Sequence, residues 1–550
     1  MGIEATNQYT GGKKITIETW PLDQVSVLKG KKFEFDSLAE MIVTRAAEIP
    51  DKPFLYFYDQ TITYRQINER ANKVANFLTG RGIKKGDFVS FLVLNSPENL
   101  YIMFGIQKIG AISGAINFML QGPEIAYLLD DSKPKIVFVG SEFMKPFAAG
   151  FEQANHKPMV VEVATGIEHT FKTVDATLAD IMKNYPDDEA LVPQKPDDPF
   201  LLLYSSGTTG RPKGILLKNA GQLALCKSQA SMNCCNEGDV MLMVLPYFHV
   251  NPICVWTYPI IFGGQTICLR KGPSPNDFWE PILDYGVTIV MGVPALYAFV
   301  LFTVDPEKID RSRLKLRYAF SGAAPMPVDI INTFKDKFNT EIIEGYGLSE
   351  SHGMSTVNPL LAKRKPGSVG VAMPGNEVKI MDDNHREMAV GSPGEICIKG
   401  DQVMICYFNQ PEATKETIKD GWLHTGDMGY MDDEGFIYIV DRKKEMINRG
   451  GENIYPREVE MAIETHPKIR DVAVIGIPDP ALTEQVKAYI ILHENQTLTY
   501  EELKEYLKDK LARYKTPSTI ELVKDFPRNP TGKVMKKELK RLEQEKAGKI

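Results

Sequence analysis

The segment YSSGTTGRPKG, Tyr204 to Gly214, combines small hydroxyl residues, glycines and a lysine directly after a strongly apolar run. Glycine lets a backbone approach phosphate oxygens closely, and hydroxyl groups beside backbone N–H groups donate hydrogen bonds to them. Lys213 adds a mobile positive charge. The order differs from the Walker A loop, because Pro212 precedes Lys213 and Gly214 follows it. Composition alone also fits a flexible surface loop, but the strand predicted before it favours phosphate binding.

Six further segments rich in glycine or in charged residues follow this loop along the chain. They are SGAAP (Ser321–Pro325), EGYGLSE (Glu344–Glu350), GEICIKG (Gly394–Gly400), GWLHTGD (Gly421–Asp427), DRKKEMINRGGENIYPREVE (Asp441–Glu460) and NPTGK (Asn529–Lys533). In type and order they resemble the motifs of the adenylate-forming superfamily, which contains AMP-forming acyl-CoA synthetases, nonribosomal-peptide adenylation domains and luciferases. The resemblance implies that ATP activates a carboxylic acid to an acyl-adenylate, which then acylates a thiol.

The resemblance implies roles for the side chains that contact the nucleotide. Lys213 and Glu350 are expected to act in adenylation, with Glu350 as the ligand of Mg²⁺, because a hard cation prefers carboxylate and phosphate oxygens. Tyr346 is expected to stack on adenine, and Asp427 and Arg442 to bind the ribose side. The residues implied to bind ATP are Ser205, Ser206, Gly207, Thr208, Thr209, Gly210, Lys213, Gly322, Ala323, Ala324, Glu344, Gly345, Tyr346, Gly347, Ser349, Asp427, Arg442 and Lys533.

Lys533 resembles the catalytic lysine of the superfamily, which bridges the substrate carboxylate and the α-phosphate. Because Lys533 lies near the end of the chain, the C-terminal domain is expected to close over the site. Lys444 matches the superfamily's hinge position, about which that domain swings after adenylation. Gly450 and Gly451 are expected to line the tunnel for the pantetheine of coenzyme A, where a side chain would block the approach.

The acyl group is expected to bind beside LPYFHVNPICVW, Leu245 to Trp256. His249 stands where relatives that activate amino acids carry an aspartate, so amino acids are disfavoured. Gly347 stands where acetate-specific relatives carry a tryptophan, which indicates an acid larger than acetate. Medium-chain, aryl and alicyclic monocarboxylates, such as benzoate or a cyclohexene carboxylate, are the candidates. The predicted lining is His249, Val250, Cys254, Met291, Gly292, Gly347 and Met354.

Other functions stay open at this point. The chain could load a carrier protein instead of CoA, act as a luciferase-like oxygenase, or bind nucleotide as a regulator without turnover. The joint presence of the five side chains with assigned roles argues against the regulator: Lys213, Glu350, Asp427, Arg442 and Lys533. One departure from the superfamily is Cys406, which occupies the usual position of a glycine before Tyr407 and puts the local turn in doubt.

The elements that must position these residues alternate between short apolar runs and helical segments, which predicts an α/β fold with parallel-rich sheets covered by helices. A helix is expected at Pro97–Lys108, and strands at Phe88–Asn95, Ala111–Ile116, Lys135–Gly140 and Phe200–Tyr204. The stretch Leu100–Leu120 has the length of a membrane span. Lys108 and several glycines interrupt it, which favours a buried helix followed by a buried strand.

The last hundred residues carry more charge, which predicts a small, mobile α+β domain. The predicted domains are residues 1–441, with the ATP and acyl pockets, and residues 442–550, with the catalytic lysine. Expected here are strands at Phe436–Val440 and Asp471–Ile477, a helix from Pro456 to about His466, a helix over EELKEYLKDKLARY capped by Thr499 and Glu502, and a basic tail from Lys536 as a solvated helix face.

Composition excludes several classes of protein. The 550 residues carry a net charge of −7, which argues against a dedicated nucleic-acid binder. Seven cysteines without a C-x-x-C pair indicate a reduced, cytoplasmic chain without a zinc motif, and a Cys234–Cys235 disulfide is disfavoured. No signal peptide or transmembrane segment is expected. The expected ligands are ATP, Mg²⁺, CoA and a small carboxylic acid, and a homodimer is left open.

Overall fold

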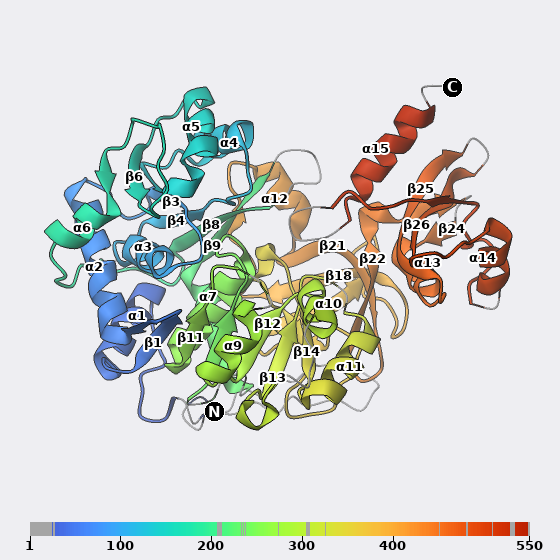
Figure 1. Cartoon of the computed structure of the whole chain (residues 1–550), viewed down its shortest axis with the longest axis horizontal. Helices are drawn as coiled ribbons and strands as arrows, with labels where there is room; N and C mark the ends of the chain where they lie inside the picture. Colours follow the sequence, from blue (N-terminus) through green and yellow to red (C-terminus); the bar gives the residue numbers. More distant parts are fainter. Residues whose placement is uncertain are drawn as a thin grey trace. The chain divides into compact units, whose positions relative to one another are not determined.

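The computed structural model describes most of the chain, which Figure 1 colours along its sequence. The described residues are 22, 25, 28–205, 212–232, 234, 236, 238–272, 274, 276–303, 309–324, 326–449, 452–479, 482–508, 510–528 and 534–547. The chain divides into two compact units that are interleaved along the sequence. Unit 1 comprises residues 1–378, 398–423 and 434–436, and unit 2 comprises residues 379–397, 424–433 and 437–550. The single boundary after residue 441 stays a prediction.

The first sheet of unit 1 contains the strands predicted for the N-terminal half. Its interior pairs are parallel, whereas β9 and β19 add antiparallel pairs at one edge. The order across the sheet is β19 (Cys406–Tyr407), β9 (Lys213–Lys218), β8 (Pro199–Ser205), β4 (Ile112–Ala115), β3 (Phe88–Leu92), β5 (Ile136–Gly140), β6 (Met159–Val163) and β7 (Ala176–Thr177). The four predicted strands are confirmed as β3, β4, β5 and β8, with ends shifted by up to three residues.

The second sheet of unit 1 is parallel in its interior and antiparallel at both ends. Its order is β16 (Val371–Ala372), β15 (Thr356–Val357), β14 (Ile342–Tyr346), β13 (Tyr318–Ser321), β12 (Ile289–Gly292), β10 (Val240–Met243), β11 (Thr266–Leu269), β1 (Pro53–Phe57) and β2 (Gln60–Thr63). Parallel strands covered by helices confirm the predicted α/β class.

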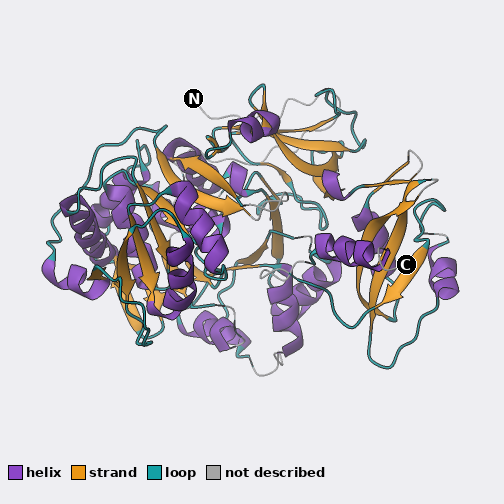
Figure 2. Cartoon of the chain, turned by 90° about the horizontal axis from the view of Figure 1, so that it is seen from above, coloured by secondary structure: helices purple, strands orange, loops and turns teal. Residues whose placement is uncertain are grey.

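Helices flank the strands of unit 1, as the view in Figure 2 shows. Most follow a strand and return the chain to the start of the next one, which parallel pairing requires. They are α1 (Leu38–Glu48), α2 (Tyr64–Gly80), α3 (Pro97–Lys108), α4 (Gly122–Ser132), α5 (Met144–Gln153), α6 (Leu178–Asn184), α7 (Asn219–Ser231), α8 (Tyr258–Gly263), α9 (Asn276–Asp284), α10 (Pro294–Thr303), α11 (Val328–Phe338) and α12 (Pro411–Thr417).

Helix α3 shows why the long apolar stretch is a buried helix and not a membrane span. Its backbone packs closely on α2, because a Cβ at Gly105 would lie only 2.7 Å from the Ala71 carbonyl oxygen. Lys108 is buried at its end, and its ammonium pairs with Glu189 at 2.6 Å. The chain then enters β4, which confirms the predicted helix and strand. Among the described residues, none of the helices is both long and apolar enough to span a bilayer.

Two further sheets complete the fold. The third has the order β17 (Asn376–Met381), β18 (Gly394–Gly400), β21 (Trp422–Met431) and β20 (Ile418–Lys419), with β22 (Ile437–Arg442) also paired to β21. The fourth, in unit 2, has the order β24 (Glu452–Ile454), β23 (Ile447–Arg449), β26 (Thr483–Leu492) and β25 (Ile469–Asp479), with β27 (Thr519–Leu522) paired to β26. Its helices are α13 (Pro456–Glu464), α14 (Tyr500–Leu507) and α15 (Lys536–Ala547).

The structure corrects two predictions in unit 2. The Thr499 hydroxyl caps α14 as expected, but the Glu502 carboxylate binds Lys468 at 2.6 Å instead of closing a capping box, and α14 ends at Leu507. The tail is not simply a solvated face, because Lys536 pairs with Glu460 at 2.7 Å with its side chain 15% exposed. A charge that begins a basic run therefore also serves as a buried counterion.

The described cysteines are thiols, in agreement with the reduced usage predicted from the sequence. They are Cys226, Cys234, Cys254, Cys268, Cys397 and Cys406. Cys235, the other half of the disfavoured disulfide, lies outside the described residues.

Candidate active site

The hydroxyl- and glycine-rich loop joins two antiparallel strands. β8 ends at Ser205 and β9 begins at Lys213, and these two residues are partners across the strand pair. The loop therefore reverses the chain, unlike a Walker A loop, which leads from a strand into a helix. The expected phosphate-binding residues Ser206, Gly207, Thr208, Thr209 and Gly210 lie outside the described residues, and their roles stay predictions.

Lys213 and Glu350 approach each other through Tyr407. The Tyr407 hydroxyl donates a hydrogen bond to Glu350 Oε1 at 2.7 Å. The Lys213 ammonium lies over the Tyr407 ring, 4.7 Å from its centroid, where a cation is attracted to the aromatic face. Two expected catalytic residues that are far apart in the sequence thus share one aromatic neighbour.

Strand pairing explains how Tyr407 reaches this place. β19 pairs with β9, so that Tyr407 lies opposite Ile215, and the Met404 N–H donates to the Glu350 carbonyl at 2.7 Å. Cys406 is a regular strand residue opposite Leu216, and its φ is not positive, so no glycine is needed there. Tyr407 is a functional candidate that sequence reasoning did not assign, because only sheet pairing connects it to the other two residues.

The carboxyl ends of β13 and β14 bring the two segments expected along adenine together. The strands are parallel and adjacent, with Ser321 opposite Glu344, so the residues that follow each strand emerge at the same edge. Ala323 has a φ of +69°, a strained conformation for a residue with a Cβ. Such strain is typical of functional loops, which supports a ligand at this edge.

Gly347 is required by packing between backbones. A Cβ at this position would lie 2.6 Å from the carbonyl carbon and oxygen of Gly353. In the sequence, this glycine indicates space left for an acid larger than acetate. In the structure, the space beside its Cα is filled by the chain itself, so Gly347 supplies no argument of its own about acyl size.

Glu344 is a residue of strand β14, and its carboxyl group is buried. Burial raises its pKa to about 7, although the Gly367 N–H, which donates to Oε2 at 3.0 Å, lowers it. The side chain therefore exchanges its proton near neutral pH. This makes the ligand-free site sensitive to pH in the physiological range.

The two residues expected at the ribose are brought together in unit 2. Asp427 on β21 lies opposite Arg442 on β22, and Arg442 Nε is 2.6 Å from Asp427 Oδ1. The Asp427 side chain is 7% exposed and that of Arg442 is 42% exposed, so the acid is fixed while the guanidinium edge faces solvent. The pair leaves carboxylate lone pairs that can accept hydrogen bonds from ribose hydroxyls.

The predicted mobile residues can be placed only in part. The backbone of Lys444 lies in the 3₁₀ turn Lys443–Glu445, directly after β22. Lys533, Gly450 and Gly451 lie outside the described residues, so the catalytic lysine and the CoA tunnel stay predictions.

A π-helix, Asn251–Thr257, forms the apolar side of the predicted acyl region and contains Cys254. Its wider turns leave carbonyls that two glutamines of α7 satisfy: Gln222 Nε2 donates to the Cys254 carbonyl at 2.7 Å, and Gln229 Nε2 to the Val255 carbonyl at 2.6 Å. The glutamines are seven residues apart and so lie on one face of α7. π-helical turns occur frequently at functional sites.

His249 precedes the π-helix as a neutral ring. Burial lowers the pKa of its imidazole to about 4, and the ring packs against Phe248 with centroids 4.2 Å apart. Because the ring is uncharged at pH 7, it adds no charge to the acyl region.

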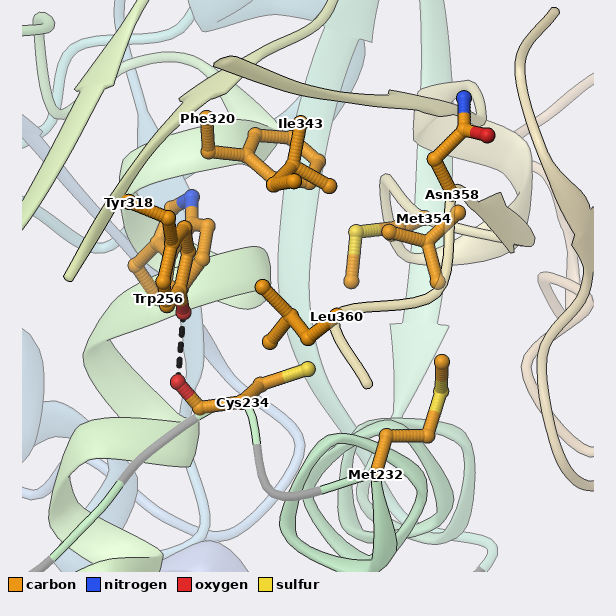
Figure 3. A pocket seen from close by; sticks show the side chains of 10 residues that line it. Met232, Cys234, Trp256, Tyr318, Phe320, Ile343, Met354, Asn358 and Leu360 are labelled. Carbon is orange, nitrogen blue, oxygen red and sulfur yellow. Dashed lines mark hydrogen bonds between the residues drawn. The ribbon is translucent and has the colours of Figure 1, made fainter. Parts of the chain in front are cut away.

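A small apolar cavity lies beyond the π-helix in unit 1 (Figure 3). The Tyr318 hydroxyl donates a hydrogen bond to the Cys234 carbonyl at 2.5 Å. The Asn358 amide donates to the Ser368 carbonyl and accepts from the Lys365 N–H. Because these polar groups are already bonded, the wall presents mainly carbon and sulfur. Of the predicted acyl residues, only Met354 lines this cavity. Its lining is Met232, Cys234, Trp256, Tyr318, Phe320, Ile343, Met354, Val357, Asn358 and Leu360.

The other predicted acyl residues are buried or half-buried nearby in the fold. Val250 is half-buried before the π-helix, and Met291 is fully buried on β12. A Cβ at Gly292 would lie 2.9 Å from Leu296 Cδ2, so this glycine allows close packing of the chain that follows β12. The sequence does not predict that Tyr318, Phe320 and Ile343 line a cavity, because apolar strand residues in the middle of a sheet cannot be distinguished from ordinary core residues.

Two family models match this chain in comparisons with known proteins. A family model described as AMP-binding enzyme matches residues 42–408, and one described as AMP-binding enzyme C-terminal domain matches residues 458–533. The long-chain-fatty-acid–CoA ligase of Bacillus subtilis (strain 168) is 33% identical over 528 residues, covering 92% of this chain and 94% of that protein. A crotonobetaine/carnitine–CoA ligase of Salmonella arizonae is 34% identical over 497 residues, covering 88% and 93%.

Solved structures of similar proteins cover nearly the whole chain. ATP-bound MatB from Rhodopseudomonas palustris has a TM-score of 0.84 at 27% identity, covering 92% of this chain and 99% of that chain. The anthranilate CoA ligase AuaEII in complex with anthranoyl-AMP also has a TM-score of 0.84 at 27% identity, covering 94% and 99%.

We expect Glu344→Gln to stabilise the ligand-free protein at high pH. The folded-state pKa of about 7 exceeds the ordinary value of 4.5, so wild-type stability falls as pH rises from 4.5 to 7. The loss is at most about 3 kcal/mol, and glutamine removes it while its oxygen still accepts from Gly367. Thermal midpoints between pH 5 and pH 8 measure this, with the lead of the variant growing as pH rises. Parallel curves for the two proteins would contradict the burial argument.

Proposed function

Since this chain belongs to the AMP-binding enzymes of the adenylate-forming superfamily, we propose that it activates a monocarboxylate with an uncharged, apolar acyl group by reaction with ATP and transfers the acyl group to coenzyme A. It is an AMP-forming acid–CoA ligase by its relatives, and the products are acyl-CoA, AMP and pyrophosphate. The observation that supports the chemistry best is the convergence of Lys213 and Glu350 on Tyr407.

The first half-reaction brings together two anions, the substrate carboxylate and the α-phosphate of ATP. The carboxylate oxygen attacks phosphorus, the bond to the bridging oxygen breaks, and pyrophosphate leaves. Positive charge placed in advance lowers this barrier, because it need not reorganise during the reaction. Lys213 supplies such a charge, and its position over the Tyr407 ring limits its freedom.

Glu350 offers the hard oxygen donor that Mg²⁺ prefers, so the residues present fit this cation. When bound, Mg²⁺ neutralises phosphate charge. The hydrogen bond from Tyr407 orients the Glu350 carboxylate beforehand. Asp427 and Arg442 then hold the ribose side, and in our proposal Lys533 of the C-terminal domain acts at the reacting carboxylate.

The second half-reaction moves the acyl group from AMP to the CoA thiol. The thiolate attacks the acyl carbon, and the bond to the AMP oxygen breaks. In our proposal the C-terminal domain swings about Lys444 and withdraws Lys533 before this step. Gly450 and Gly451 then leave room for the pantetheine arm.

The apolar surroundings support an uncharged acyl group. The cavity wall presents mainly carbon and sulfur, His249 is neutral, and the lining of this cavity includes no acidic side chain. The neutral His249 and the uncharged residues of the π-helix offer no counter-charge to a quaternary ammonium such as that of carnitine, and burying it without one would be costly. We therefore propose medium-chain, aryl and alicyclic acids in preference to carnitine or an amino acid.

A carboxylate panel tests the substrate class. AMP release and thioester formation should be measured with octanoate, benzoate, a cyclohexene carboxylate, acetate and carnitine, each with ATP, Mg²⁺ and CoA. We expect one of the three apolar acids to give the highest kcat/KM. Carnitine as the best substrate would refute the apolar class, and absence of AMP release with every acid would refute the enzyme assignment. Replacing CoA by an acylatable carrier protein separates the carrier-loading alternative.

Lys533→Ala should reduce acid-dependent pyrophosphate exchange by roughly 100-fold or more, since it removes the charge at the reacting oxygens. Attack of CoA on a supplied acyl-adenylate should proceed near the wild-type rate. Stopped-flow or quenched-flow assays of the two half-reactions give the comparison. Equal losses in both would remove Lys533 from its assigned role.

Gly451→Leu should give the opposite pattern. A side chain in the pantetheine tunnel should slow thioester formation by roughly 100-fold through misplacement of the thiol, while pyrophosphate exchange persists. The same two assays measure it, with Gly272→Leu as a control at a glycine without a left-handed φ, where a Cβ would meet no atom within 4 Å. A loss of exchange with thioester formation intact would contradict the tunnel.

Tyr407→Phe should raise the KM for Mg·ATP by roughly five- to tenfold, the effect of one hydrogen bond of about 1 kcal/mol. The ring under Lys213 is retained, so kcat should change less. Tyr407→Leu removes both contacts and should lower kcat as well. Pyrophosphate exchange at varied ATP provides both constants. If the Phe and Leu variants behave alike, the cation–π contact contributes nothing.

A further inference from the structure

Glu395, Cys397 and His424 form a compact group of potential metal ligands in unit 2. Glu395 and Cys397 are two residues apart on β18, so their side chains lie on the same face of the sheet. His424 lies on the neighbouring strand β21. The spacing of these residues along the sequence does not predict the group, because His424 reaches the other two residues only through the pairing of β21 with β18.

Two of the three distances within the group are close to the edges of a zinc coordination sphere. His424 Nδ1 lies 3.4 Å from Cys397 Sγ and 3.2 Å from Glu395 Oε2, and all three ligand atoms lie within 4.8 Å of one another. Zinc bonds of about 2.3 Å to sulfur and about 2.0–2.1 Å to nitrogen and oxygen predict tetrahedral N···S and N···O edges of about 3.6 and 3.4 Å. Only small side-chain shifts would close the site.

The surroundings also suit a cation. The side chains of Glu395 and His424 are 10% and 7% exposed, and Cys397 is fully buried, so competing water is scarce. The ring of His385, an exposed residue, contacts that of His424 with centroids 4.7 Å apart. A water molecule can supply the fourth ligand of a tetrahedral site.

Lys443 competes with a metal for the Glu395 carboxylate, so a bound metal must displace it. Its ammonium lies 3.2 Å from Glu395 Oε2 and 2.7 Å from Asp383 Oδ1. A divalent cation would repel it, and Asp383 can retain it. The other Glu395 oxygen accepts from the Gly426 N–H at 2.9 Å, which keeps the carboxylate oriented in either state.

We propose that Glu395, Cys397 and His424 bind one divalent transition-metal cation of the zinc type. The cation replaces the thiol proton of Cys397, which is released to solvent, so that a thiolate, an imidazole and a carboxylate surround it. This site is independent of the Mg²⁺ that the proposed function places at Glu350, and of the reaction itself.

Titration of the chelator-treated full chain with Co²⁺ tests the proposal. Co²⁺ bound by thiolate in a tetrahedral site gives a near-ultraviolet charge-transfer band and strong visible bands. We expect both to saturate at one Co²⁺ per chain and to disappear when Zn²⁺ is added. Zn²⁺ should also raise the thermal midpoint by mass action.

Matched variants locate the binding. Cys397→Ser should abolish the charge-transfer band and the Zn²⁺-dependent thermal shift, whereas Cys268→Ser, at an equally buried thiol on β11, should keep both. Glu395→Gln should weaken Co²⁺ binding at least roughly tenfold while it preserves the thiolate band at saturation. No thiolate band in the wild-type protein, or a band that survives in Cys397→Ser, would overturn the proposal.

Discussion

The hydrogen bond from Tyr407 to Glu350 connects the two large sheets of unit 1 at their functional edges. Tyr407 belongs to the first sheet, next to Lys213, while Glu350 follows β14 of the second. Both sheets must hold their partners at fixed positions, because opposite charges organise a triphosphate only when their separation is constant. A second bond, from the Met404 N–H to the Glu350 carbonyl, fixes the backbone at the same junction. Lys213 and Glu350 depend on this junction for their relative placement.

Much of this arrangement can be predicted from local sequence. Buried strands read as apolar runs, Pro97 marks the start of α3, and the ordered motifs predict roles for Lys213, Glu350, Asp427 and Arg442. Asp427 and Arg442 are indeed cross-strand partners. The strands and the start of α3 are determined by residues within a few positions of each other. The roles of the site residues are predicted from the order of the motifs.

What could not be predicted depends on pairing between distant segments. The sequence motif contains Tyr407 but assigns it no role, since its contacts with Lys213 and Glu350 follow from β19 joining β9. The Glu502 carboxylate binds the ammonium of Lys468, 34 residues away in the sequence, instead of its own helix terminus. Gly347 suggested open volume, yet the Gly353 backbone occupies that space. The Glu395–Cys397–His424 group was likewise invisible to a search for ligand spacing along the chain.

The π-helix has a consequence for how this enzyme family can diversify. A π-turn accommodates one residue more than the α-turn it replaces, and here the glutamines of α7 hold the displaced carbonyls. Deleting one residue before Trp256 would let the segment rewind as an ordinary helix and rotate every later side chain by about 100°. The indole would then leave the wall it now forms. The shape of the pocket at this place therefore depends on the number of residues in each helical turn. A point substitution leaves this number unchanged, whereas the deletion of one residue changes it.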